Sequence, residues 1–164
     1  MKDWTGIEIE RTKQGLEQAS ATVLGRMIFE FSRLDFALGL LLVWSGQGRQ
    51  LEEQTSKVED LGFSKKLEYL DELVRAKYGK LGAAQSPYAQ WLEDADSVRQ
   101  LRNELVHGRW GVEPTKNRVI NIIGLPTSPD QTTKEYAIAD LKRILERMVE
   151  LQHRLAILRS QSPL

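Results

Sequence analysis

The 164-residue sequence has no cysteine, only two histidines and no excess of charge, because 23 basic side chains balance 23 acidic ones. Without cysteine the chain can form no disulfide, no thiolate nucleophile and no cysteine-ligated zinc site. Two histidines alone argue against a structural zinc site. Balanced charge gives no global signal of nucleic-acid binding, although a local basic cleft remains compatible with it. We therefore expect no metal or other cofactor, and a reducing cytoplasmic setting.

Long hydrophobic runs are also absent. The most apolar stretch, Leu34–Trp44, contains Asp35 and is far too short to span a bilayer, so we interpret it as buried core. The opening residues MKDWTGIEIER are charged throughout, and we expect neither a signal peptide nor contact with a membrane. The sequence contains no P-loop, no dinucleotide-binding glycine pattern and no G-x-S-x-G elbow.

Helical periodicity dominates the first half of the chain. Residues Met1–Gly15 are weakly patterned and predict a lead-in with a helical turn around Ile7–Thr12. A long helix is predicted from Leu16 to Trp44, because apolar residues recur there at i, i+3 and i+4. Its core stripe comprises Leu24, Met27, Ile28, Phe31, Leu34, Leu38, Leu41 and Leu42. The opposite side carries Phe29, Phe36, Leu40 and Val43, which we expect to meet a second subunit.

The middle of the chain predicts shorter elements. Residues 49–61 fit either a short helix or a loop. A helix capped by Ser64 is expected to end near Gly79. Another is expected to follow Ser86-Pro87, which resembles an N-cap with proline at the first helical position, and to end at about His107 before Gly108.

After Gly108 the period changes to that of strands. Apolar residues on both sides of Glu113–Asn117 predict a β-hairpin over about 109–124. A linker with two prolines follows, and Thr132 or Thr133 is expected to open the last helix. The core face of that helix comprises Leu141, Ile144, Leu145, Met148, Leu151, Leu155 and Leu158. The sequence thus predicts one mainly all-α domain over 1–164, an up-and-down bundle of four to five helices with a small hairpin before the last.

Two charged residues interrupt the predicted core stripes. Arg102 lies about 40° from Val98, the centre of the stripe on the helix that ends near His107. Asp35 lies about 40° from Phe31 on the first long helix. A buried charge needs a partner. Asp35 and Arg102 either form a structural ion pair, or Asp35 orients Arg102 at a site, and the two interpretations are compatible.

A second, polar strip on the same helix carries Asn103 and His107, which are neighbours at i and i+4, together with Arg99. On an ideal helix Arg102 and His107 point about 140° apart. They can converge on one ligand only if the helix unwinds near Gly108 or if a second subunit completes the site. The simpler alternative for His107 is a histidine that stabilises a helix C-terminus.

The stretch RNELVHGRW, Arg102–Trp110, resembles the HEPN superfamily (higher eukaryotes and prokaryotes nucleotide-binding domains). These are small helical bundles, often dimeric, and many are metal-independent ribonucleases marked by arginine, four to six residues and then histidine. Arg102, Asn103 and His107 fit this pattern, including the polar residue after the arginine. Arg147 and His153 also match the bare spacing, but Met148 follows that arginine in a plain amphipathic helix.

The resemblance implies a chemistry for each residue. His107 would exchange a proton with an RNA 2′-hydroxyl or a leaving 5′-oxygen. Arg102 would bind the scissile phosphate, and Asn103 would hold the histidine or a substrate oxygen. Asp35 would orient Arg102. Further phosphate contacts would come from Arg99 and Arg109.

The family resemblance implies a homodimeric toxin or phage-defence ribonuclease that leaves a 2′,3′-cyclic phosphate, with a neutralising antitoxin or regulatory protein as a further partner. The alternative is a non-catalytic dimeric module that binds nucleotide, RNA or a partner protein, and balanced charge favours it slightly. A plain structural helical domain is the third interpretation.

Overall fold

The computed structural model describes residues 4–164 and divides the chain into two compact units. The first unit takes the residues up to Phe29 together with Leu101–Glu146, and the second takes Glu30–Gln100 together with Arg147–Leu164. The expectation of a single domain stays a prediction.

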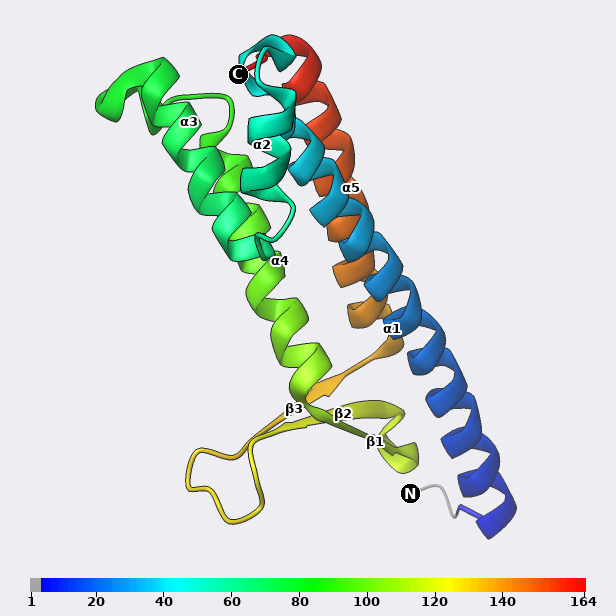
Figure 1. Cartoon of the computed structure of the whole chain (residues 1–164). Coiled ribbons are helices and arrows are strands. Elements are labelled where there is room, and N and C mark those ends of the chain that lie inside the picture. Colours follow the sequence, from blue (N-terminus) through cyan, green and yellow to red (C-terminus); the bar gives the residue numbers. More distant parts are fainter. Residues whose placement is uncertain (1–3) are drawn as a thin grey trace. The chain divides into compact units, whose positions relative to one another are not determined.

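The described residues form five α-helices and three β-strands (Figure 1). The helices are α1 (Gly6–Val43), α2 (Leu51–Val58), α3 (Phe63–Ala83), α4 (Ala89–His107) and α5 (Ile138–Gln161). The strands are β1 (Arg109–Glu113), β2 (Arg118–Ile123) and β3 (Thr132–Tyr136), and two short 3-10 helices cover Ser45–Gly48 and Pro114–Lys116. The predicted class, mainly helical with a small antiparallel element before the last helix, is confirmed. Within the described part of the chain, no helix combines the length and apolarity needed to cross a membrane.

Helix α1 begins ten residues earlier than the predicted start at Leu16. The helical turn predicted around Ile7–Thr12 lies inside it, but the rest of the lead-in from Gly6 onward is helical too, and that part of the prediction is wrong. The reason is a capping box around Thr5. The Thr5 hydroxyl accepts a hydrogen bond from the Glu8 N–H at 3.2 Å, and a Glu8 carboxylate oxygen accepts one from the Thr5 N–H at 2.9 Å. The first three residues of the predicted lead-in lie outside the described residues.

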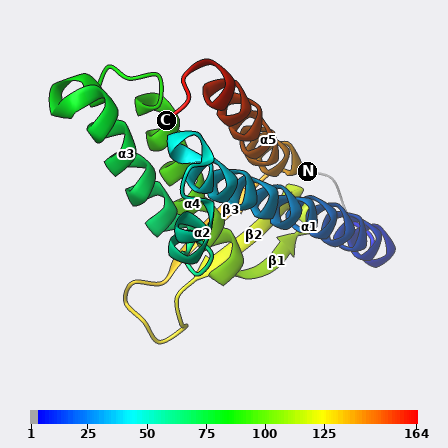
Figure 2. The same ribbon diagram turned by 45° about the horizontal axis from the view of Figure 1, so that its top comes forward.

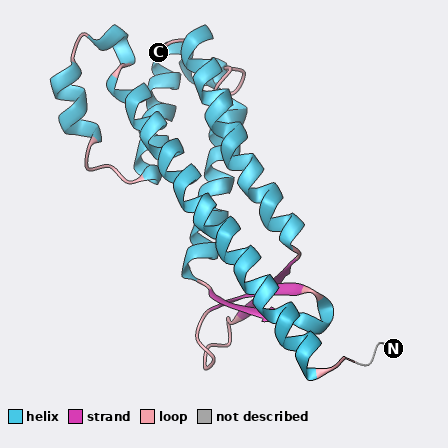
Figure 3. Cartoon of the chain, turned by 90° about the vertical axis from the view of Figure 1, so that its right-hand side faces the viewer, coloured by secondary structure: helices cyan, strands magenta, loops and turns pink. Residues whose placement is uncertain are grey.

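The predicted hairpin is confirmed as β1 and β2, but the sheet has a third strand (Figure 3). Residues Thr132–Tyr136 pair antiparallel with β2, so a helix start at Thr132 or Thr133 is wrong. Helix α5 begins at Ile138 instead, where the Asp140 carboxylate accepts a hydrogen bond from the Ala137 N–H at 2.7 Å. That contact satisfies one of the donors left free at a helix N-terminus.

In the second unit, the two predicted serine caps are wrong. The N-cap of α3 is Gly62, and α4 begins at Ala89. The Ser86 hydroxyl donates to the Ala83 carbonyl at 2.7 Å and so engages the preceding helix. Helix α3 was expected to end near Gly79, and it kinks there at a positive φ of 75° before continuing to Ala83.

The core of the second unit follows the predicted helical stripes. Leu34, Leu38 and Leu42 of α1 are fully buried, as is Trp91 of α4, whose indole donates to the Leu151 carbonyl at 2.9 Å. The C-terminus lies beside the turn after α1, where the Gly46 N–H donates to the Leu164 carbonyl at 3.0 Å (Figure 2).

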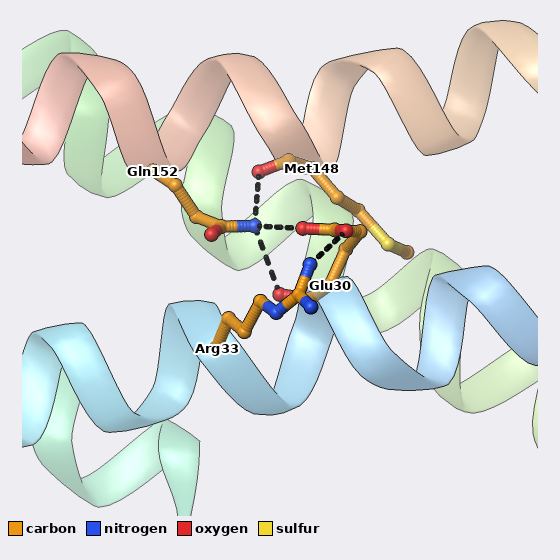
Figure 4. A network of polar contacts seen from close by, with 4 residues as sticks. All are labelled: Glu30, Arg33, Met148 and Gln152. Carbon is orange, nitrogen blue, oxygen red and sulfur yellow. Dashed lines mark hydrogen bonds and ion pairs between the residues drawn. The ribbon is translucent and has the colours of Figure 1, made fainter.

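A polar network joins α1 to α5 within the same unit (Figure 4). The Gln152 amide donates to the backbone carbonyl of Glu30 at 3.0 Å and to its carboxylate at 2.9 Å. Arg33 donates to the other oxygen of that carboxylate at 2.6 Å. Gln152 can reach both the carbonyl and the carboxylate of Glu30 at only one axial position of α5 along α1. The two bonds therefore fix the register of α1 against α5 in this unit.

Candidate functional site

The candidate site is the last turn and a half of α4 and the start of β1, all within the first unit. Arg102 and Asn103 are half-buried, whereas His107, the last residue of α4, is exposed. The helix stays regular to its end, because the Gly108 N–H donates to the Glu104 carbonyl at 3.0 Å. Five residues of regular helix turn the side-chain direction by about 140°, so unwinding near Gly108 does not bring Arg102 and His107 together.

Arg102 and Asn103 are joined directly. The Arg102 guanidinium donates to the Asn103 side-chain oxygen at 3.2 Å. The amide oxygen therefore faces the arginine, which leaves the two amide hydrogens as the donors that Asn103 can offer to another group. A predicted contact between Asn103 and His107 would have to use those donors.

The sheet holds the end of α4 through contacts from two strands. The indole N–H of Trp110 in β1 donates to the Leu105 carbonyl at 2.9 Å, and its ring lies 6.1 Å from that of Tyr136 in β3. Lys134 of β3 forms an ion pair with Glu104. That hydrogen-bonded ion pair raises the pKa of the lysine above its usual range. The last turn of α4 is thus fixed on its sheet side, while His107 stays open to solvent.

A second close contact joins Gly108, the residue after His107, to the side chain of Asn121. A Cβ placed on Gly108 would lie 1.9 Å from Oδ1 and 2.5 Å from Nδ2 of Asn121, in the middle of β2. Only glycine allows so close an approach, and Gly108 is not among the glycines with positive φ. Asn121 is 1% exposed, and neither of its side-chain polar atoms has a hydrogen-bond partner among residues 4–164.

Arg109 is exposed on β1, and no ion pair to it exists in the described part of the chain. Its guanidinium is therefore available to an external anion. Its neighbour Val106 at the end of α4 is also exposed, at 46%, which leaves an apolar side chain beside His107 on the surface.

The other two predicted site residues belong to the second unit. Arg99 donates to Asp96 at 2.7 Å, and this hydrogen bond holds the pKa of the Asp96 carboxyl below its usual range. Asp35 accepts a hydrogen bond from the buried Lys66 at 2.9 Å. Both side chains therefore have a charge partner within their own unit, and their predicted roles toward phosphate and toward Arg102 stay predictions.

Sequence reasoning missed Asn121 and Trp110 as parts of this arrangement. The available signal for Asn121 was a lone amide inside the apolar run Val119–Ile123, where a strand buried on one side should carry an apolar residue. For Trp110 the signal was an indole just beyond a helix end, since a buried indole N–H needs an acceptor.

No cluster of three or more histidine and carboxylate side chains that could hold a metal ion occurs in residues 4–164. Comparison with family models, with characterised proteins and with solved structures finds no match to this chain.

Proposed function

We propose that this protein is a metal-independent endoribonuclease that acts as a homodimer. The observation that carries the proposal is the exposed His107 on the fixed end of α4, with the Arg102–Asn103 pair one turn before it. An imidazole can transfer the proton, and a forked cation and an amide can stabilise the phosphoryl charge, when RNA is cleaved at its 2′-hydroxyl. The exposed Arg109 adds a phosphate contact two residues after the histidine.

In the proposed reaction, a neutral His107 imidazole takes the proton from the ribose 2′-hydroxyl. The 2′-oxygen then attacks the adjacent phosphorus, and the bond from phosphorus to the 5′-oxygen breaks. A water molecule gives a proton to that leaving oxygen. The products are a 2′,3′-cyclic phosphate and a 5′-hydroxyl, and Arg102 stabilises the charge on the phosphoryl oxygens. Proton balance is restored when the His107 imidazolium gives its proton to the hydroxide that the water leaves.

The dimer is proposed because the side chains of Arg102 and His107 leave α4 in different directions. A regular helix holds Arg102 and His107 about 140° apart. In a two-fold dimer the His107 of one chain would face the Arg102 of its partner, which gives two composite sites. The exposed Val106 supports a contact at this end of α4, since an apolar side chain beside a site is stabilised when a partner covers it.

A toxin or phage-defence role in the cytoplasm, restrained by an antitoxin or regulatory protein, belongs to the same proposal. The second candidate is a non-catalytic dimeric module that binds nucleotide, RNA or a partner protein. Its support is that Arg102 is half-buried and already bonded to Asn103, and that the chain has no net charge to attract RNA.

The test is cleavage of transfer RNA and total RNA in excess EDTA, with end-group analysis for the cyclic phosphate. Wild type is compared with His107→Ala and Arg102→Gln, and His153→Ala is the matched control because His153 is the other histidine. We expect cleavage by wild type and the control, and loss in the two site variants. Intact RNA with every protein, or cleavage by His107→Ala at the wild-type rate, rejects the nuclease and leaves the binding module.

A further inference from the structure

Asn121 is a buried polar side chain that the strand around it does not explain. It lies between Ile120 and Ile122 in β2 and is 1% exposed. Neither its Nδ2 nor its Oδ1 has a hydrogen-bond partner among the described residues. Buried polar groups are nearly always paired, and an apolar side chain of similar shape would avoid the desolvation cost. An amide at this position therefore calls for a reason other than core stability.

The position of the amide supplies that reason. Its Cγ, Oδ1 and Nδ2 all lie within 2.5 Å of the point where a Gly108 side chain would begin. The two residues fit together so closely that any residue larger than glycine at 108 displaces either the amide or the chain. Gly108 is bonded to His107, so the amide limits where the backbone after His107 can lie.

The same strand pair fixes the rest of the turn. Trp110 is the register partner of Asn121, and its indole holds the Leu105 carbonyl. Lys134, the register partner of Asn121 on the other side, holds Glu104. The row Trp110–Asn121–Lys134 across the sheet thus contacts Leu105, Gly108 and Glu104 of the turn that carries His107. The two outer contacts are polar bonds to α4, and the central one is steric.

We infer that Asn121 is a positioning residue of the candidate site, which sets the direction of the His107 imidazole through its contact with Gly108. The inference rests on the proposed function for its catalytic consequence, but the positioning itself can be measured without RNA. Asn121 is too deeply buried to touch a substrate, so its effect must act through Gly108 and His107.

The first test uses the imidazole signals of the protein's two histidines in 1H–13C NMR spectra. Asn121→Leu should shift the His107 signals and leave those of His153 in place, with far-UV circular dichroism unchanged. Asn121→Ala, which adds no volume, replaces it if the leucine variant does not fold. Unchanged His107 signals in the folded variant overturn the inference.

The second test asks whether the contact is specific. Gly108→Ala should disturb the His107 signals strongly, because the new methyl group enters the space of the amide. Adding Asn121→Ala frees that space and should return the signals toward those of wild type. If Gly108→Ala disturbs His107 equally with and without Asn121→Ala, the contact does not position the histidine and the inference is wrong.

The catalytic consequence is a lower turnover number in Asn121→Leu, by about 10- to 100-fold, with little change in KM. Substrate binding through Arg102 and Arg109 is not altered, whereas the imidazole is misdirected. Shifted His107 signals in a protein that never cleaves RNA would support the positioning and reject the nuclease. If wild type cleaves RNA and Asn121→Leu cleaves it at the full rate, the nuclease is supported and the positioning role of Asn121 is rejected.

Discussion

The indole N–H of Trp110 donates to the backbone carbonyl of Leu105 at 2.9 Å, so the first residues of the sheet cap the helix that precedes them. Leu105 lies in the last turn of α4, where backbone carbonyls have no N–H donor within the helix. The bond joins two residues that are five positions apart in the sequence, with His107 and Gly108 between them. It therefore links the stability of the sheet to the geometry of the candidate site.

Trp110→Phe removes this bond while keeping an aromatic ring beside Tyr136. Because it leaves the Leu105 carbonyl without its protein partner, we expect the free energy of unfolding to fall by about 1 kcal/mol. Urea denaturation followed by circular dichroism measures the change. The control is Trp44→Phe, since Trp44 is 48% exposed and should change stability by no more than about 0.5 kcal/mol. Equal losses in both variants would contradict a capping role for Trp110.

The ion pair between Lys134 and Glu104 connects α4 to β3, the strand that the sequence did not predict. Charge-reversal variants test this contact. Lys134→Glu and Glu104→Lys each place like charges together, and both should lower stability. The double variant restores opposite charges and should recover most of the loss. Both side chains are more than a third exposed, so the expected coupling is only roughly 0.2–1 kcal/mol.

This coupling has a defined pH range. The hydrogen bond from Lys134 to Glu104 raises the lysine pKa above its ordinary value of 10.5. The lysine contribution is complete below 10.5 and is lost as pH rises through the folded pKa. Coupling that is equal at pH 8 and above pH 12, or absent at pH 8, would contradict the contact.

In the second unit, the ion pair between Asp94 and Arg154 should stabilise the fold less in acid than at neutral pH. The hydrogen bond from Arg154, at 2.6 Å, holds the pKa of the Asp94 carboxyl below its ordinary value of 3.8. A lowered pKa stabilises the folded state above 3.8, and this contribution is lost as pH falls through the folded pKa. Because both groups are about a third exposed, Asp94→Asn should cost at most about 1 kcal/mol at pH 7.

Urea denaturation at pH 7, 5 and 3 measures the effect of Asp94→Asn. The gap between wild type and variant should persist at pH 5 and narrow at pH 3. Asp60→Asn is the control, since Asp60 is exposed and its side chain makes no hydrogen bond in the described part of the chain. A gap that stays constant down to pH 3 would show that the ion pair does not stabilise the folded state.

Periodicity predicted the buried faces of the helices better than it predicted where helices and strands begin or which side chains contact one another. Leu34, Leu38 and Leu42 are buried as their spacing indicates, because helix geometry alone decides which residues share a face. Strand β3 was missed because its residues Thr132–Glu135 are exposed and carry no apolar alternation. Its partner β2 supplies the hydrogen bonds that define it as a strand.

The candidate site shows the same division. The local spacing of Arg102, Asn103 and His107 places all three on one helix end, as predicted. The contact between Gly108 and Asn121 could not be predicted, because it joins residues on different elements at a distance that no periodicity encodes. Asp35 was singled out because it lies in an apolar stripe. Helical periodicity cannot identify the partner of such a residue, and within its unit that partner is Lys66.

The proposed dimer predicts that two inactive variants restore activity when mixed. In a mixed dimer, the His107→Ala chain contributes its intact Arg102 and the Arg102→Gln chain contributes its intact His107, so one of two composite sites is complete. Half of the dimers in an equal, fully exchanged mixture are mixed, and the expected recovery is roughly a quarter of wild-type cleavage. The chains are exchanged by mild denaturation and refolding, and each variant treated alone is the control. A mixture as inactive as its components, from variants that form dimers, would place the arginine and the histidine of one reaction on the same chain. The regular helix between Arg102 and His107 argues against that outcome.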